Sequence, residues 1–423
     1  MNAEPTNKRA AMRAALAIAP GVMFVGVAGG IAFPILPFVG LRAGLSLPFI
    51  GFILAANRMA RVFASPAVGT LADRLGGRRL LLIGLASQIA VMSLYLMGVV
   101  IGHPGAFFLA ARLLHGPGSA CVFVAAQVLA LHAGGVHHGG KTAGLVRAAM
   151  TTGMPVGLVV GGLLSARFGD RVTFGAAIGA VLVASVLAAA LVPDLRAAQR
   201  VRANLRGLLR VMSEPHVLAL GALNLATFFS AQGTVLTTLV LLIQARSLTL
   251  AGLGTQSSAS LVMGVLVLIS AAASITVGRL ADRYNASARW GVVGQLILAT
   301  GLGLTTVVSS PAMLLVSVGL VGCGMGAMNP CLVALLGLFV KPEVRGSAVG
   351  AVQLFGDIGG SLGPVVGGAL FARSTGAPFW VSALVTGCAL PAGLWLVRAE
   401  RHARAQADRP AGTDGVGLPE GEL

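Results

Sequence analysis

The sequence predicts an all-α membrane protein in which twelve transmembrane helices form two six-helix pseudo-repeats, with both termini in the cytoplasm. Three observations lead to this prediction. Hydrophobic residues make up 56% of the 423-residue chain and charged residues only 10%, whereas an ordinary globular domain carries roughly 25% charged residues. Apolar runs of about 20 residues, the length that crosses a bilayer, recur along the chain. The later runs also repeat sequence patterns of the earlier ones.

The predicted spans are separated by short polar connections. They cover residues 15–39, 47–71, 80–101, 106–131, 143–165, 172–192, 217–243, 256–278, 290–308, 311–338, 346–370 and 377–397. The first run follows Lys8, Arg9 and Arg13 and so resembles a signal peptide. It continues to about Val39 with no small-x-small cleavage site, and we therefore expect a retained span.

The longest internal polar stretch divides the chain into two halves. We expect a cytoplasmic N-terminal tail (1–14), a first six-helix half (15–192), a cytoplasmic linker (193–216), a second six-helix half (217–397) and a cytoplasmic, disordered tail (398–423). In the linker, Leu205, Leu208 and Leu209 follow helical spacing, with Arg206 and Arg210 on another face. This pattern is typical of a helix lying on an anionic leaflet, but it also fits a plain linker held inside by its charge.

The formal net charge is +17, a value often seen in nucleic-acid-binding proteins. However, the basic residues gather in the connections on one side of the predicted membrane. The opposite connections contain only Arg42, Arg167, Arg171, Arg246 and Arg373. This asymmetry is the positive-inside pattern, so the charge indicates orientation and we expect no nucleic-acid partner. We expect a multi-pass protein of the plasma (inner) membrane that acts as a monomer in the lipid bilayer.

Three short patterns occur twice, in the same order and at nearly equal offsets. They are Gly69-Thr-Leu-Ala-Asp73-Arg74 with Gly278-Arg-Leu-Ala-Asp282-Arg283, His115-Gly116-Pro-Gly118 with Cys323-Gly324-Met-Gly326, and Gly157-Leu-Val-Val-Gly161-Gly162 with Gly363-Pro364-Val-Val-Gly367-Gly368. Such a repeat indicates two copies of a six-span unit, which places a substrate path at their interface near the membrane midplane.

The same residues resemble motifs of the major facilitator superfamily. The stretch from Gly69 to Arg79 resembles its loop 2–3 signature, and Arg112-Leu-Leu-His115-Gly116 resembles its fourth-span motif. Gly363-Pro364-Val-Val-Gly367-Gly368 resembles the antiporter motif, here in the eleventh span, whereas the fifth-span copy has Leu158 in place of proline. The resemblance implies a secondary transporter with alternating access, most like twelve-span proton-coupled drug or metabolite exporters.

The first and third patterns predict structural roles. Asp73 ends the second span among Arg74, Arg78 and Arg79. There a carboxylate can cap a neighbouring helix or pair with an arginine, which would form a cytoplasmic gate; the alternative is a solvated loop. The gate prediction includes Gly69, Asp73, Arg74, Arg78, Arg79, Gly278, Asp282 and Arg283. Helix packing through small residues is predicted at Gly157, Gly161, Gly162, Gly363, Pro364, Gly367 and Gly368.

Asp357 alone among the 13 acidic residues is predicted to lie deep in a span. It lies about 11 residues, or roughly 16 Å, into the eleventh span, and Arg58 lies at a similar depth in the second. Spans two and eleven are neighbours in the fold that the sequence resembles. We therefore predict an ion pair between Arg58 and Asp357 across the two halves. Asp357 is then either the proton-coupling carboxylate or the partner in a permanent structural pair.

Other polar residues near mid-depth suggest a proton relay or cavity lining. Arg112 and His115 lie on the fourth span, and Asn57 and Arg61 extend the polar stripe of the second span. His115 titrates near neutral pH when unperturbed, but a lone histidine is more often a packed residue. We expect Arg147 to reach the cytoplasmic interface.

Four arginines within the predicted spans outnumber the one aspartate, which favours an anionic or zwitterionic substrate over a lipophilic cation if they face the cavity. We expect no metal, no cofactor and no enzymatic activity, because the sequence has no phosphate-binding loop and no catalytic or metal-ligand constellation. The leading prediction is proton-coupled efflux of a small drug-like or metabolic molecule. The alternatives are a facilitator or symporter of an organic anion with arginines as substrate ligands, and a transport-dead sensor or scaffold.

Overall fold

The structure, a computed structural model, describes residues 8–192, 210–250, 252–340 and 344–407. Every regular element in these residues is helical, which confirms the all-α prediction for this part of the chain. The first half contains α1 (Lys8–Ala32), α2 (Ile35–Arg42), α3 (Leu47–Leu75), α4 (Gly77–Ile101) and α5 (Pro104–Leu191). The second half contains α7 (Pro215–Thr227), the π-helix η1 (Phe228–Val235), α8 (Leu236–Ala245), α9 (Thr255–Tyr284), α10 (Ser287–Thr306), α11 (Pro311–Phe339), α12 (Arg345–Phe371), α13 (Ala377–Cys388) and α14 (Leu390–Ala407).

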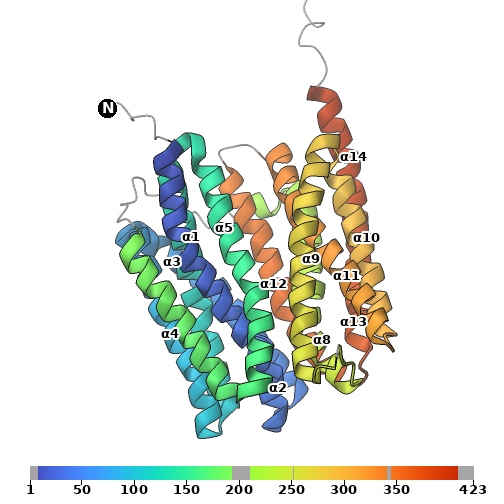
Figure 1. The fold of residues 1–423 in the computed structure, drawn as a ribbon. Coiled ribbons are helices and arrows are strands. Elements are labelled where there is room, and N and C mark those ends of the chain that lie inside the picture. The colour runs from blue at the N-terminus through green and yellow to red at the C-terminus, as the bar shows by residue number, and fades with distance from the viewer. Residues whose placement is uncertain (1–7, 193–209, 251, 341–343, 408–423) are drawn as a thin grey trace, which may run out of the picture.

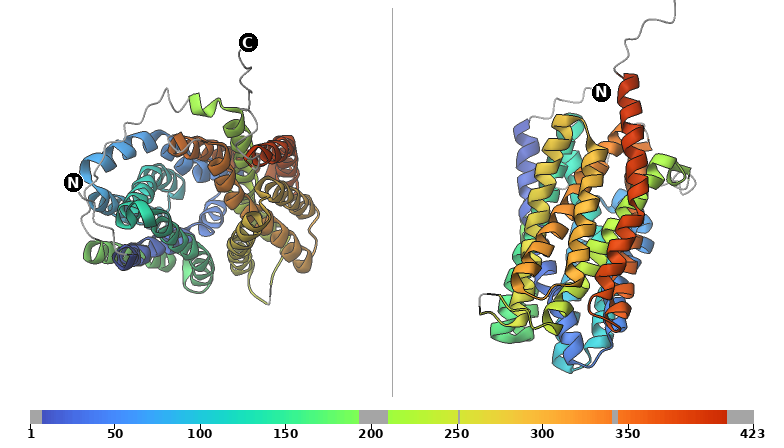
Figure 2. Two further views of the ribbon diagram at one scale, coloured as in Figure 1. Left: turned by 90° about the horizontal axis from the view of Figure 1, so that it is seen from above. Right: turned by 90° about the vertical axis from the view of Figure 1, so that its right-hand side faces the viewer.

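The helices run roughly along one axis in a single bundle (Figure 1). We name its two ends by the chain. The terminal end is where α1 begins and α14 ends, and the distal end is where the turns after α2 and α8 lie. Viewed along the axis, the helices of the two halves form two groups that meet at α3 and α12 (Figure 2). The linker residues 193–209 and the tails 1–7 and 408–423 lie outside the described residues.

The long element α5 contains more than one membrane crossing. Its 88 residues would measure about 130 Å as a straight rod, several times the thickness of a bilayer. Instead, its ribbon folds back on itself (Figure 1). At Gly169 the backbone has φ +81, a left-handed conformation that glycine adopts without a Cβ clash. The chain therefore reverses at Gly169, between the predicted fifth and sixth spans.

Ten helical stretches in the described residues are long and apolar enough to cross a membrane. One of them, Ala148–Leu191, is 44 residues long and overlaps both predicted spans 143–165 and 172–192. Helix α10, which corresponds to the predicted span 290–308, is not among the ten. A multi-pass membrane protein is thus confirmed, whereas the count of twelve and the side on which the termini lie stay predictions.

Buried apolar side chains fill each half and also join the halves at the distal end. One core lies entirely within the first half, and another within the second. A third core belongs mainly to α8, α9 and α11, but it includes Phe38 of α2 and Leu158 of α5. Both side chains come from the first half, so the two halves are packed against each other through apolar contacts there.

Candidate functional site

The midplane acid and two arginines meet where α3 crosses α12. Arg61 Nη2 forms an ion pair with Asp357 Oδ1, and Arg58 Nη1 lies 3.8 Å from the same oxygen. Asp357 is only 7% exposed. We call these three residues the mid-depth clamp. The sequence suggested Arg58 as the partner of Asp357, but Arg61, one turn along the same helix, is the closer one.

Two glutamines and an aromatic ring complete the surroundings of the clamp. Arg58 Nη2 donates a hydrogen bond to Gln232 Oε1 at 2.9 Å, and its guanidinium lies 5.4 Å from the centre of the Phe228 ring. Gln353 Nε2 approaches Asp357 Oδ1 at 3.5 Å. Sequence reasoning missed both glutamines, although an amide within an apolar span is a signal that could have found them.

The local backbone explains how Gln232 reaches Arg58. It lies in η1, where the seventh span winds as a π-helix with buried residues on most sides. A π-helix rotates the side chains that follow it relative to a regular α-helix, and such segments occur often at functional sites. In the described residues Arg58 Nη1 makes no hydrogen bond although it is buried. The clamp therefore has two guanidinium groups, one carboxylate and an unused donor.

The charge of the clamp is held at bilayer depth by mutual pairing. Removing one partner of a buried ion pair leaves an uncompensated charge and costs about 3–5 kcal/mol. Since Asp357 belongs to the second half and both arginines to the first, that energy acts directly on the contact between the halves. A change of protonation at Asp357 would act on the same contact.

The glycine motifs occupy equivalent positions in the two halves. Gly157 and Gly161 of α5 pack against the backbone of α1, and Gly363 and Gly367 of α12 pack against η1 and α8. The last glycine of each motif instead contacts the opposite half. Gly162 faces Ser260 of α9, and Gly368 faces Leu47 and Gly51 of α3, while the carbonyl of Pro364 also lies against Gly51.

A chain of polar contacts also connects the halves at the distal end. Arg42 pairs with Asp170, and Ser165 Oγ donates to the other oxygen of that carboxylate. Gln256 of α9 then donates from Nε2 to Ser165 Oγ at 2.6 Å. Together with the glycine contacts, these polar contacts join the two halves at the distal end.

The predicted gate is described only in part. The side-chain positions at Gly69, Asp73 and Asp282 lie outside what the structure describes. The other gate residues are distributed along the terminal end. Arg74 and Arg79 are exposed, and Arg78 Nη2 donates a hydrogen bond to the Ala189 carbonyl at 2.6 Å. The guanidinium of Arg283 lies 5.7 Å from the centre of the Tyr284 ring. Gly278 packs near Pro330. The gate therefore stays a prediction.

Arg112 and His115 lie on α5 and border a small hollow whose wall also includes residues of α1 and α4. Arg112 is 4% exposed, and its guanidinium lies 5.4 Å from the centre of the Phe33 ring. Asn57 is half-buried, and its carbonyl packs against Gly116. The side chain of Arg147 is outside the described part of the structure.

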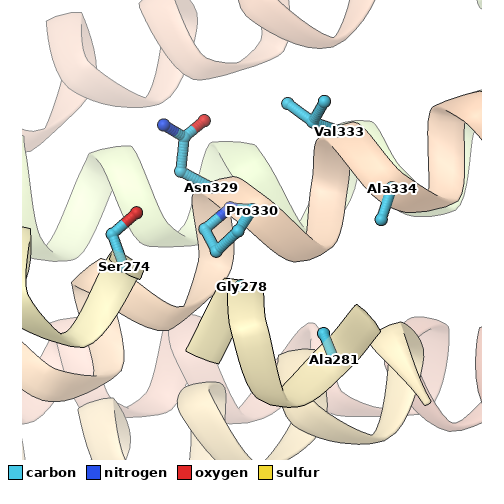
Figure 3. A pocket seen from close by; sticks show the side chains of 7 residues that line it. All are labelled: Ser274, Gly278, Ala281, Asn329, Pro330, Val333 and Ala334. Atoms are coloured by element: carbon cyan, nitrogen blue, oxygen red, sulfur yellow. The ribbon is translucent and has the colours of Figure 1, made fainter. Parts of the chain in front are cut away.

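A hollow of about 360 Å³ lies between α9 and α11, nearer the terminal end (Figure 3). Its wall is uncharged and formed by Ser274, Gly278, Ala281, Asn329, Pro330, Val333 and Ala334. Gly278 follows Gly264 by about four helical turns, so both lie on nearly the same face of α9. Gly264 contacts α5 of the other half. All seven residues that line the hollow, in contrast, belong to the second half.

Comparisons with known proteins agree with this architecture. The family model of the Major Facilitator Superfamily matches residues 18–255 and 248–418. No curated protein matches. Among solved structures, the nucleoside transporter NupG matches with a TM-score of 0.70 at 15% identity, covering 93% of this chain and 99% of that one. An alanine mutant of NupG matches with a TM-score of 0.72 at 15% identity, covering 92% and 99%.

A third solved structure is the human organic anion transporter MFSD10 (TETRAN), with a TM-score of 0.66 at 16% identity, covering 92% of this chain and 99% of that one. At such identities the structural similarity shows the fold alone. The family model, in contrast, covers nearly the whole chain. The chain therefore belongs to the Major Facilitator Superfamily, and it is a membrane transporter and not an enzyme.

Proposed function

We propose that this transporter exports a small drug-like or metabolic molecule in exchange for protons, with Asp357 as the proton-binding carboxylate. The observation that carries the proposal is the mid-depth clamp, because it links a titratable group directly to the contact between the halves. Ionisable residues at bilayer depth are costly and typically mark proton and substrate pathways.

The mechanism follows from the charge state of the clamp. With Asp357 ionised, both arginines hold α12 against α3, and the distal side stays closed. A proton on Asp357 removes the carboxylate charge, so Arg58 and Arg61 lose their shared partner. A substrate that competes for the same groups has the same effect. The empty, unprotonated carrier therefore favours the distally closed state, and a bound proton or substrate shifts the population towards the open state.

The uncharged hollow beside α9 supports an apolar or neutral portion of the substrate, because its wall offers only Ser274 and Asn329 as polar side chains. The direction of transport rests on two sequence features. The basic residues favour a cytoplasmic terminal end, and the stretch from Gly363 to Gly368 resembles the antiporter motif. Because one chain contains both halves of the path, we propose a monomer, acting in the plasma (inner) membrane.

A second candidate is a facilitator or symporter of an organic anion, with arginines as substrate ligands and Asp357 as a structural partner. The burial of Arg112 favours it, and one structural neighbour is an organic anion transporter. The two candidates differ in what a proton gradient does to transport.

Inverted membrane vesicles with an imposed pH gradient separate the candidates. They are given cationic, neutral and anionic probes, and the wild type is compared with Asp357→Asn. The exposed acid Glu214 provides a matched control, Glu214→Gln. Exchange predicts gradient-driven probe movement that Asp357→Asn abolishes and the control retains. If only anionic probes move, with or without the gradient, and Asp357→Asn still transports them, the facilitator would replace proton exchange as the function.

A further inference from the structure

Arg112 is a buried cation with unused hydrogen-bond donors. Its side chain is almost fully enclosed at 4% exposure, yet neither Nε nor Nη2 has a hydrogen-bond partner among the described residues. A buried charged group whose hydrogen-bond donors have no acceptor is energetically unfavourable. The Phe33 ring faces the guanidinium, but a ring face does not satisfy these N–H groups. Among the described residues, these two donors are therefore available to an acceptor supplied by a ligand or by water.

The two free donors are neighbours on one side of the guanidinium. Nε and Nη2 form the side-on fork with which arginine binds both oxygens of a carboxylate. Arg112 borders a small hollow between α1, α2, α4 and α5, and His115 and Gly29 also form its wall. His115 Nδ1 is likewise buried and without a hydrogen-bond partner in the described residues. One fork and one imidazole thus meet at the same space.

The space in front of Gly29 is open. A Cβ added there would meet no heavy atom within 4 Å. The hollow has a volume of about 10 Å³, which is at the lower limit for one water-sized group. Met92 also borders it, and because methionine is flexible, its side chain can move to admit a second oxygen.

The electrostatic surroundings select an anion. Arg112 and Arg61, both positive, act on His115, and both also act on Arg58, while the acid Asp357 pairs with Arg58 and Arg61. A cationic ligand group would be repelled here, and a neutral one would leave the charge of Arg112 uncompensated.

We propose that Arg112, with His115 beside it, forms a subsite that binds a carboxylate group of the transported substrate. The inference rests on the transport function proposed above, but on neither its direction nor the role of Asp357. It assigns the anionic end of the substrate to the first half, whereas the uncharged hollow by Gly278 belongs to the second half.

Binding to the purified full chain in nanodiscs tests the subsite. Acetate and benzoate are compared with acetamide and benzamide at constant ionic strength, by calorimetry and by the shift in melting temperature. The carboxylates should bind and the amides should not. Arg112→Gln should weaken carboxylate binding by about tenfold to a hundredfold, the usual effect of losing a charged hydrogen-bond pair.

A glycine variant tests the space separately from the charge. Gly29→Ala places a methyl group in the open hollow without a clash, so it should fold normally and weaken carboxylate binding. Gly175→Ala on α5 is the matched control, because a Cβ there also meets nothing within 4 Å. The exposed Arg289 supplies the charge control, Arg289→Gln. Both controls should bind like the wild type.

The proposed subsite would be refuted by equal binding of amides and carboxylates, by unchanged binding in Arg112→Gln, or by no carboxylate binding to the wild type. In each case the acceptor at Arg112 would be a buried water. Asp357→Asn separates this inference from proton exchange. Carboxylate binding should persist in that variant even where gradient-driven transport fails, and a failure of binding alone would leave proton exchange standing.

Discussion

Gly51 is the position at which a single methyl group should shift the balance between the two ends of the transporter. It lies on α3 against the Pro364 carbonyl of α12. A Cβ at this position would also lie 2.9 Å from the Pro364 carbonyl carbon and 3.4 Å from Val365 Cα. These are backbone atoms, which cannot rotate away as a flexible side chain does. Gly51→Ala therefore requires α3 and α12 to separate at the distal end.

The size of the effect follows from the cost of overpacking. Inserting a methyl group into a close-packed contact costs about 1–3 kcal/mol. The cost applies in the distally closed state only, because alternating access separates α3 from α12 when that end opens. The ratio of open to closed molecules should therefore rise by roughly 5- to 150-fold.

Distances between spin labels measure this ratio. Labels at Ala43 and Ser309, both exposed, report the distal separation of the halves in a background whose four cysteines are replaced. Gly350→Ala on α12 is the control, because its Cβ meets nothing within 4 Å. The long-distance population should grow in Gly51→Ala and not in the control. Identical distance distributions in the wild type and Gly51→Ala would refute the assignment of a distally closed state.

Two further predictions concern other contacts. Gln256→Ala removes the 2.6 Å hydrogen bond to Ser165, which is worth about 1 kcal/mol. The same spin labels should therefore show a roughly fivefold increase in the ratio of open to closed molecules. No increase would mean that this bond does not hold the two halves together. Glu400 is 3% exposed and accepts hydrogen bonds from the backbone N–H of Ser287 at 3.0 Å and of Ala288 at 2.8 Å. Glu400→Ala should therefore destabilise the second half by about 3–5 kcal/mol; a melting temperature in detergent equal to that of the wild type would contradict this.

The sequence is most informative about features that depend on composition and spacing. Apolar runs predicted helices, and the repeated motifs predicted two halves. Arg58 and Asp357 lie at similar depths because both are near the middle of long spans. The family resemblance indicated that these two spans are neighbours. These features survive small errors in register, because they depend on segments and not on individual side-chain directions.

Finer details of the site depend on helix rotation, which hydropathy does not record. Arg58 and Arg61 lie one turn apart on the same face of α3, so the sequence could not decide which is closer to Asp357. Gln232 reaches Arg58 from a π-helical segment, and no pattern in the sequence indicated the change in winding. The unpaired donors of Arg112 depend on how separate helices pack around them, which only the three-dimensional structure reveals.

The central claim is that protonation of Asp357 controls the contact between the halves, and the spin-label pair tests it without a known substrate. In the wild type, acidification should increase the distal open population, because a proton on Asp357 removes the charge that both arginines share. Asp357→Asn imitates the protonated state, so it should be open to the same extent throughout. A pH response that persists in Asp357→Asn, or is absent from the wild type, would contradict the account.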